Sequence, residues 1–303
     1  MAHDTTGVFN AFLNQGEVID AIIGLDYKEH PWVYDQVFNI KSSSKSREHI
    51  RHYAGLGYLG QYGEGQTPTL DEAIAGYEHW LTHVQWGLGF QVTEMMLDDD
   101  QYDRVRRLTE ELAFSGRHTV ETVAAYVLIN GLTTNGYDGV PLFSDSHPLE
   151  NGSTGSNVAS TDADLSQIAL EDAYAKASWV LDGRGKPVGT PPTHLIVSPN
   201  DAIVASKLVK SAFEPETGNN AINPLKGKLS VIVWPQLFIS ETGFDDWFLI
   251  NKSRQDLRFY WRKQLKPDSV FDGHSRSMTH YLRGRFCCGY ADWRYTYGVS
   301  GAA

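Results

Sequence analysis

The sequence predicts a mixed α+β fold, because it contains one long strand, one long helix and a later series of short strands. Apolar and polar residues alternate from Tyr77 to Val92, which is the period of a β-strand with one buried side. An apolar stripe at helical spacing follows and continues to Asn130-Gly131, a usual helix end. We therefore expect a strand that leads into a helix of about 30 residues, followed by a second unit of helices and strands.

The composition excludes several classes of protein. The chain has 303 residues, with 26 Lys and Arg against 37 Asp and Glu, for a net charge of −11. Modules that grip DNA or RNA concentrate positive charge, so this balance argues against one, although an enclosed nucleic acid stays compatible with it. No apolar run approaches the roughly 20 residues that span a bilayer, and residues 1–7 lack the features of a secretory signal. We expect a soluble chain with no membrane partner.

The N-terminal region indicates an arm and a loop more than a compact core. The polar tract 41–52 holds the one basic cluster of the chain, and it is either a solvated linker or an arm against another subunit. Gly55, Gly57 and Gly60 spell G-x-G-x-x-G, but more glycines and Pro68 follow and prevent the helix that a dinucleotide site needs. A long hairpin or loop is the better interpretation.

The predicted strand and helix also bear on metal binding. His79 and His83 lie four residues apart on the strand, or roughly 13 Å, so they are too far apart to share one ion. The run Asp98-Asp99-Asp100 lacks the alternating ligand order of a calcium loop, and its carboxylates suit the N-terminus of the helix instead. We expect no metal site and no cofactor.

The stretch Ser144-Asp145-Ser146-His147 invites interpretation as a hydrolase site. Triad residues come from distant segments, however, and the chain has no G-x-S-x-G elbow. We therefore expect no catalytic residue here, and a soluble hydrolase that uses Ser146 or His147 stays the less favoured alternative.

The second unit should begin with a helix near residues 166–180 and a strand at 193–197. Ser198-Pro199-Asn200-Asp201 is typical of a helix start, with Ser198 as the N-cap, and this helix should run toward Ser211. Strands are expected at 229–234, 247–250 and 257–261, and an extended segment at 281–299. Cys287 and Cys288 would face opposite sides of a strand, so we expect no redox pair.

Six stretches together carry a resemblance to a known family. They are Gly76-Tyr77-Glu78 through Gly89-Phe90-Gln91-Val92-Thr93; Asp98-Asp99-Asp100-Gln101-Tyr102; Leu142-Phe143-Ser144-Asp145-Ser146-His147-Pro148; Ser198-Pro199; Asn219-Asn220 through Asn223-Pro224 before Leu229–Pro235; and Asp246-Trp247-Phe248-Leu249-Ile250. In this order they resemble the tailed-phage major capsid proteins of the Hong Kong 97 type fold, and among them the Mu-like major head subunits of the gpT kind. The likeness covers nearly the whole chain.

The resemblance implies a division of the chain into five regions. Residues 1–53 would form an N-terminal arm and residues 54–76 an extended loop. Residues 77–142 would form the peripheral domain with its strand and long spine helix, and residues 143–256 the axial domain. Residues 257–303 would contain the returning strands of the peripheral domain and the C-terminus.

The resemblance also implies a structural function without enzyme activity. The subunits would assemble into hexamers and pentamers of an icosahedral shell that encloses double-stranded DNA without sequence-specific binding. The protein would reside in the virion, after assembly in the host cytoplasm. The expected partners are a portal protein and a separate scaffolding protein, and a decoration protein could also attach to the shell. An acidic inner wall would repel the packaged DNA.

One feature departs from some members of the family. The stretch from Ala54 to Gly76 contains no lysine, so cross-linking between a lysine of this loop and an asparagine of a neighbour is not expected. An encapsulin-like compartment, whose shell would share the fold but enclose a cargo enzyme, is the main alternative. A tail or decoration protein would form rings, tubes or trimers instead.

Overall fold

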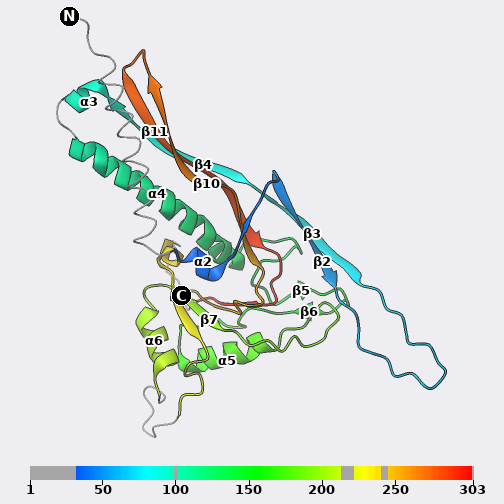
Figure 1. The fold of residues 1–303 in the computed structure, drawn as a ribbon. Coiled ribbons are helices and arrows are strands. Elements are labelled where there is room, and N and C mark those ends of the chain that lie inside the picture. The colour runs from blue at the N-terminus through cyan, green and yellow to red at the C-terminus, as the bar shows by residue number, and fades with distance from the viewer. Residues whose placement is uncertain (1–31, 99–101, 213–221, 240–244, 302–303) are drawn as a thin grey trace, which may run out of the picture.

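The structure is a computed structural model that describes residues 32–98, 102–212, 222–239 and 245–301. Two four-stranded sheets and three substantial helices form its body, and one hairpin projects from it (Figure 1). The predicted α+β class is confirmed.

The first sheet has the order β1-β10-β11-β4 and carries the longest helix on one face (Figure 1). Its strands are β1 (Asn39–Ser42), β10 (Leu257–Asp272), β11 (Ser277–Tyr290) and β4 (Val84–Thr93). A short helix, α3 (Glu94–Asp98), leads from β4 to α4 (Tyr102–Ile129), whose 28 residues match the predicted long helix. The helix ends in a 3-10 turn, η1 (Asn130–Leu132), at the predicted stop.

The long helix packs closely on this sheet because Gly116 faces it. A Cβ atom at this position would lie 2.3 Å from Cδ2 of Leu282 on β11. Leu282 is buried together with Leu112 and Ala113 of α4. The absence of a side chain at residue 116 therefore sets how near the helix lies to the strand.

The second sheet has the order β12-β9-β7-β8, and two helices cover it. Its strands are β7 (His194–Val197), β8 (Ser230–Val233), β9 (Trp247–Ile250) and β12 (Thr296–Val299). The helices are α5 (Gln167–Ser178), with Ser166 as its N-cap, and α6 (Ala202–Lys210). A 3-10 helix, η2 (Pro235–Ile239), follows β8, and a small pair, β5 (His147–Pro148) and β6 (Thr154–Gly155), precedes α5.

A buried carboxylate on α4 joins elements that are far apart in the sequence. Glu121 accepts hydrogen bonds from the backbone N–H of Val33 at 2.7 Å and of Tyr34 at 3.1 Å, and from Nε1 of Trp234 at 3.0 Å. These bonds fix the start of α2 (Tyr34–Val37) and the end of β8 against the helix. Burial raises the pKa of Glu121, and the three N–H donors oppose that rise.

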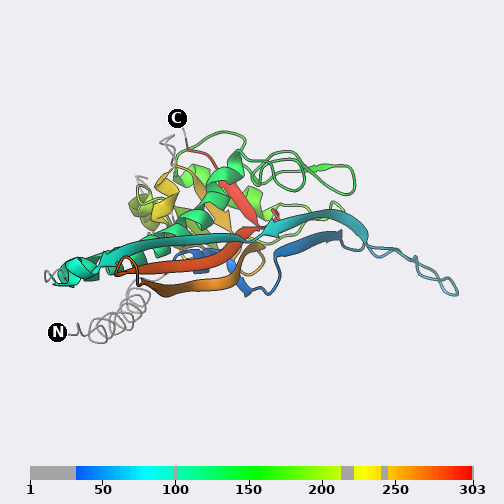
Figure 2. The same cartoon turned by 90° about the horizontal axis from the view of Figure 1, so that it is seen from above.

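A third element is the hairpin of β2 (Arg47–Ala54) and β3 (Ile74–Thr82), whose strands pair antiparallel. Residues 55–73 join the two strands as a long loop that we call the projecting loop. It points away from the body in both Figure 1 and Figure 2. The predicted hairpin or loop is thus confirmed for the glycine-rich stretch, which contains no helix.

Two sequence-based predictions about the first half of the chain were wrong. The strand expected from Tyr77 to Val92 is broken at His83, because β3 pairs with β2 while β4 pairs with β11. Its apolar side is also only partly covered, with Trp80 of β3 48% and Leu88 of β4 57% exposed. The tract 41–52 is not an unstructured linker, because β1 pairs with β10 and β2 pairs with β3.

Two further corrections concern the second half. The segment Ser198–Asp201 forms a turn, and α6 begins only at Ala202 with Asp201 as its N-cap. Ser198 directly follows β7 and is buried, three residues before the N-cap. Strand β12 pairs with β9, so the C-terminal part of region 257–303 belongs to the second sheet and not to the first. The expected capping role of Asp99 and Asp100 lies outside the described residues.

Candidate functional site: the projecting loop

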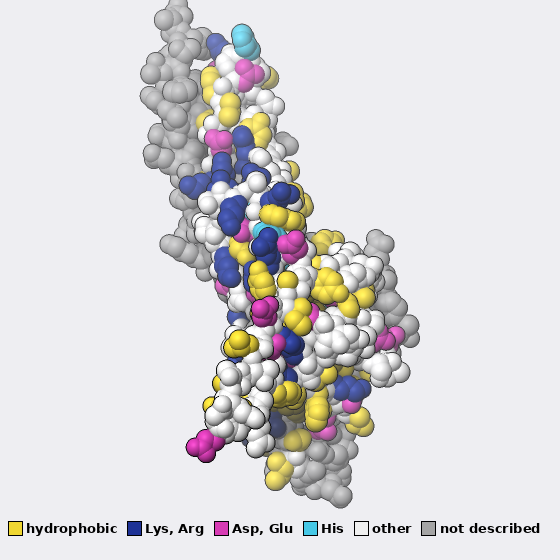
Figure 3. Space-filling model, turned by 90° about the vertical axis from the view of Figure 1, so that its right-hand side faces the viewer, with side chains coloured by type: hydrophobic (Ala, Val, Ile, Leu, Met, Phe, Trp, Pro, Cys, Tyr) yellow, Lys and Arg dark blue, Asp and Glu magenta, His cyan; other side chains and the backbone are white. Residues whose placement is uncertain are grey.

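The projecting loop exposes large apolar side chains that the described part of the chain does not cover. Leu59 is 102% exposed, Leu70 93% and Tyr58 77%, and Leu56 and Tyr62 are also exposed. Soluble monomers rarely leave such a group of side chains in water unless another molecule covers it. Figure 3, which looks onto this side of the molecule, shows hydrophobic side chains interspersed with charged ones.

An arginine from the body fixes both ends of the loop. Nε of Arg184 donates to the carbonyl oxygen of Gly55 at 3.0 Å. Its Nη2 donates to the carbonyl oxygen of Glu72 at 2.5 Å and to Oδ1 of Asp71 at 3.2 Å. One guanidinium thus bridges the residues where the loop leaves β2 and where it returns toward β3. The backbone N–H of Gly57 and the Arg184 guanidinium lower the pKa of Asp71.

A tight turn presents this arginine together with a lysine. Oδ1 of Asp182 accepts the backbone N–H of Arg184 at 2.9 Å and of Lys186 at 2.8 Å, and Gly185 adopts a φ of +78° that favours glycine. Nζ of Lys186 then donates to the carbonyl oxygen of Leu56. We call residues 182–186 the clasp. The sequence analysis missed it, because the Asp-Gly-Arg-Gly-Lys run predicts a turn but not what the turn contacts.

The Ser-Asp-His stretch lies elsewhere and has a structural arrangement. His147 is fully buried, with Nδ1 at 2.6 Å from Oδ2 of Asp138 and Nε2 at 3.1 Å from Oδ1 of Asn157. Its ring stacks on Trp293 with centroids 4.1 Å apart. Both ring nitrogens therefore already have oxygen partners, and neither is left to activate a nucleophile.

The neighbouring serines do not complete a triad. Ser144 and Ser146 lie 3.2 Å apart through their hydroxyl oxygens, and the backbone N–H of Ser144 donates to Oδ1 of Asn157. Among the hydrogen bonds of the described residues, none joins either hydroxyl to the imidazole of His147. The stretch connects α4 to the second unit, and its polar side chains satisfy buried backbone groups there.

The residues considered for metal or redox chemistry are likewise separated. His79 lies on β3, whereas His83 is buried between β3 and β4 with Nε2 3.1 Å from Oγ of Ser43. In the described part of the chain, no three His, Cys, Asp or Glu side chains are grouped to hold a metal ion. Cys287 and Cys288 are free thiols, and burial raises the pKa of each to about 12.

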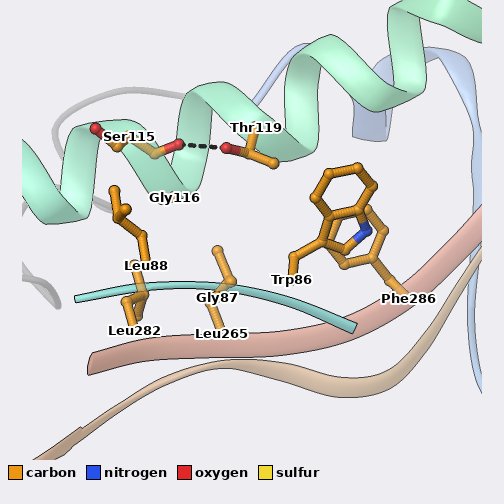
Figure 4. A pocket seen from close by; sticks show the side chains of 9 residues that line it. All are labelled: Trp86, Gly87, Leu88, Ser115, Gly116, Thr119, Leu265, Leu282 and Phe286. Atoms are coloured by element: carbon orange, nitrogen blue, oxygen red, sulfur yellow. Dashed lines mark hydrogen bonds between the residues drawn. The ribbon is translucent and has the colours of Figure 1, made fainter. Parts of the chain in front are cut away.

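A small cavity lies between α4 and the first sheet (Figure 4). Its volume is about 80 Å³, and its lining is mostly apolar: Trp86, Gly87, Leu88, Ser115, Gly116, Thr119, Leu265, Leu282 and Phe286. The hydroxyl of Thr119 bonds the carbonyl oxygen of Ser115 and so is not offered to a ligand. The cavity is smaller than the roughly 150 Å³ that accommodates benzene in an engineered core, and we read it as a packing defect.

The comparison with protein families decides the identity of the fold. Residues 77–299 match the model of a family described as phage capsid protein, and this stretch is well over half of the chain. The chain belongs to the phage capsid protein family. The matched stretch contains both four-stranded sheets apart from β1, while the projecting loop precedes it. No curated protein matches the sequence.

Solved structures share the fold of this capsid protein at low sequence identity. A chain of the capsid of cyanophage P-SCSP1u has a TM-score of 0.61 at 9% identity, over 90% of this chain and 88% of that one. A chain from Mycobacterium phage Adephagia gives 0.58 at 12% identity, over 90% and 91%. A virus-like particle from Pyrococcus furiosus gives 0.57 at 10% identity, over 93% and 98%. At these identities the likeness establishes the fold alone.

Within the described residues, this capsid protein has no helix long and apolar enough to cross a membrane. As a phage capsid protein it is a structural component of the virion. The residues with the clearest functional geometry are accordingly those of the projecting loop and the clasp.

Proposed function

We propose that this chain is the major capsid subunit of a tailed phage of the Hong Kong 97 type. Its copies assemble into hexamers and pentamers that tile an icosahedral shell around double-stranded DNA. The observation that carries the proposal is the projecting loop, whose exposed apolar side chains are held by the clasp in a fixed position outside the body.

The loop has the properties of a contact element between subunits. Burying Tyr58, Leu59 and Leu70 would each contribute roughly 1.5–3 kcal/mol, and a neighbouring subunit can provide that burial. We expect the loop to dock on a different part of the neighbouring subunit, which would make the contact heterologous. Heterologous contacts close into rings when the rotation between subunits allows it, as capsomers require.

We assign the parts of the fold to the regions of such a subunit. The first sheet with α4 corresponds to a peripheral domain and the second sheet with α5 and α6 to an axial domain that meets its copies at the centre of a capsomer. The extended loop comprises the β2–β3 hairpin with the projecting loop. We further propose that the subunit is of the Mu-like gpT kind.

The charge distribution of the subunit suggests which of its faces lies toward the DNA. The side chains of Lys263, Lys266 and Arg283 are exposed. Successive side chains of a strand point to opposite faces, and Leu282 faces α4, so Arg283 lies on the face of the sheet away from α4. Lys and Arg side chains gather on the upper part of the face in Figure 3. We place this cationic face away from the DNA, so that the wall lined by the remaining acidic surface repels it. A portal, a separate scaffolding protein and a decoration protein are proposed partners, with assembly in the host cytoplasm.

Negative-stain electron microscopy of the expressed protein, alone and with a scaffolding protein, tests the proposal. We expect closed shells of uniform size, or shells together with capsomers. Small, uniform oligomers in both samples would contradict it.

A protein compartment without a genome is the second candidate, because a virus-like particle from Pyrococcus furiosus shares the fold over nearly the whole of both chains. The DNA content of shells purified from infected or induced cells separates the two functions. Nuclease-protected DNA of uniform length indicates a phage head, and an enclosed protein without DNA indicates a compartment.

A further inference from the structure

A cluster of aromatic rings lies where the β2–β3 hairpin meets the body. His52 of β2 and His79 of β3 both lie nearly parallel to the ring of Tyr137, which follows α4 in the chain. The centroid of Tyr137 is 4.7 Å from that of His52 and 4.8 Å from that of His79, with interplanar angles of 12° and 10°. The two imidazoles are themselves 6.4 Å apart. Both strands of the hairpin therefore rest on one tyrosine of the body.

The site is built to hold these rings closely. Tyr290 of β11 lies at the edge of the cluster, 5.5 Å from Tyr137 and 6.5 Å from His79. A Cβ atom on Gly136 would collide with the hydroxyl of Tyr290, so only glycine fits beside it. Gly136 therefore lets Tyr290 lie directly against this part of the backbone.

This arrangement favours the neutral form of both imidazoles. Nε2 of His52 and Nδ1 of His79 are buried and have no hydrogen-bond partner in the described structure. A buried nitrogen without a partner can be tolerated in a neutral ring but is costly in a charged one. Burial lowers the pKa of His52, and burial together with the neighbouring His52 lowers that of His79 to about 4.

The charged groups around the cluster do not reverse this preference. The charged or titratable groups that act on the two rings are His49 of β2, Asp256 and Arg258 around the start of β10, and Asp292 and Arg294 after β11. A backbone hydrogen bond with Tyr290 also favours a proton on His79, but its effect is smaller than that of burial. The carboxylates favour protonation and the guanidiniums oppose it, and they alternate in the sequence as two Asp-Arg pairs. Burial therefore decides the protonation state.

We propose that His52, His79 and Tyr137 form an acid-sensitive hinge, which anchors the base of the β2–β3 hairpin at neutral pH and frees it when the imidazoles take up protons. In the freed hairpin both rings reach water and regain an ordinary affinity for protons. A proton on one ring also repels a proton on the other at 6.4 Å. The ratio of anchored to freed hairpin then falls by up to tenfold per pH unit for each ring that titrates below about pH 6.5, and for His79 this continues to about pH 4.

The hinge is distinct from the clasp, which holds the two ends of the projecting loop. Because the pKa of Asp71 is lowered, the Arg184–Asp71 pair persists through the same pH range. The hinge is therefore best observed in an Arg184→Ala background. Any effect of the hinge on shell assembly rests on the proposed function. The mobility of the hairpin can be measured on dispersed subunits whether or not that function is correct.

The test follows the mobility of the loop with a fluorophore on Leu59→Cys, a fully exposed position. The native thiols are buried with raised pKa values and should not compete for the label. We expect the fluorescence anisotropy of the Arg184→Ala protein to be constant above about pH 7 and to decrease between about pH 6.5 and about pH 4. Circular dichroism should show an intact fold over that range.

Variants of the hinge supply the decisive comparison. The double variant His52→Phe, His79→Phe keeps aromatic rings in the stack but removes the titrating groups, so it should abolish the decrease in anisotropy. If the two phenylalanines prevent folding, the double variant His52→Gln, His79→Gln takes its place. His49→Phe is the matched control and should retain the decrease. Three results would each overturn the proposal. They are a constant anisotropy in the Arg184→Ala protein, the same decrease after both histidines are replaced, and loss of the fold over the same pH range. A protein that fails to form shells yet shows the expected profiles would contradict the proposed function alone.

Discussion

Arg184 is the residue on which the position of the projecting loop depends most directly. Its planar guanidinium donates to two backbone carbonyl oxygens and one carboxylate at once. A lysine offers one ammonium group and cannot reach the same three acceptors with fixed geometry.

We therefore expect Arg184→Ala to accelerate proteolytic cleavage within residues 55–73 several-fold, with Arg184→Lys intermediate. The pair with Asp71 is partly exposed, so the free energy of unfolding should change by less than about 1 kcal/mol. Limited proteolysis followed by mass spectrometry measures the first quantity and urea denaturation the second. Equal cleavage rates in all three proteins would show that the clasp does not hold the loop.

His147 is a second residue whose role can be tested alone. Removing its buried ring by His147→Ala leaves Oδ2 of Asp138 without its imidazole partner and removes one of the contacts of Asn157, so it should reduce the free energy of unfolding by about 2–4 kcal/mol. Ser146→Ala is the control, because this exposed hydroxyl should change stability by less than about 0.5 kcal/mol. An unchanged stability in His147→Ala, together with loss of an esterase activity, would favour the hydrolase alternative.

At the scale of elements, strand β12 joins the C-terminal part of the chain to the second sheet. Gly298 makes this junction possible, because a Cβ atom there would lie 2.6 Å from the ring of Phe143. That ring is buried and stacks on Phe248 of β9 at 5.0 Å, so it has little room to move.

Gly298→Ala should accordingly lower the free energy of unfolding by about 1–3 kcal/mol through overpacking. Gly55→Ala is a matched control at the start of the projecting loop, where a Cβ atom would meet nothing within 4 Å. Thermal unfolding of both variants checks the expectation, and equal melting temperatures would mean that the β12 junction is looser than the structure shows.

The projecting loop is the element on which assembly should depend. Leu59→Asp leaves the fold intact because the side chain contacts little of its own chain, but it places a charge where we expect burial against a neighbour. Electron microscopy should show loss of shells, with an unchanged melting temperature. Leu59→Met keeps an apolar side chain and should still assemble; shells of both variants would exclude Leu59 from the contact.

At the scale of the whole molecule, stability should fall as the solution is acidified. Burial lowers the pKa of five histidines: His52, His79, His83, His194 and His280. The unfolded chain takes up protons on them below about pH 6.5, while the folded chain does not, so acid favours unfolding.

Three buried or partly buried carboxyls act in the opposite direction. The pKa of Asp201 is raised to about 6 by burial and by nearby aspartates, and those of Asp246 and Glu121 are also raised. The folded chain binds protons on these groups more readily than the unfolded chain, which offsets part of the loss. Urea denaturation at pH 7.5 and pH 5.5 should show a net decrease on the order of 2 kcal/mol, after allowance for partly exposed rings. An increase on acidification would show that the carboxyls dominate.

The sequence by itself determined the elements whose signals are local. The alternation around Trp86, the apolar stripe of α4 with its stop at Asn130, and the apolar run Trp247–Ile250 each reflect the side chains of one segment, and the structure confirms them as β4, α4 and β9. The glycines from Gly55 to Gly65 likewise ruled out a helix, and the order of motifs pointed to the capsid family that residues 77–299 match.

Only the tertiary structure decided which distant segments meet. The break at His83 arises because β3 and β4 pair with different strands, and the placement of β12 depends on its pairing with β9. The contact of Arg184 with Gly55 and Glu72 spans more than one hundred residues, and no local pattern encodes it. A period in the sequence reports which face of a segment is apolar, whereas strand pairing and side-chain contacts depend on how the whole chain packs.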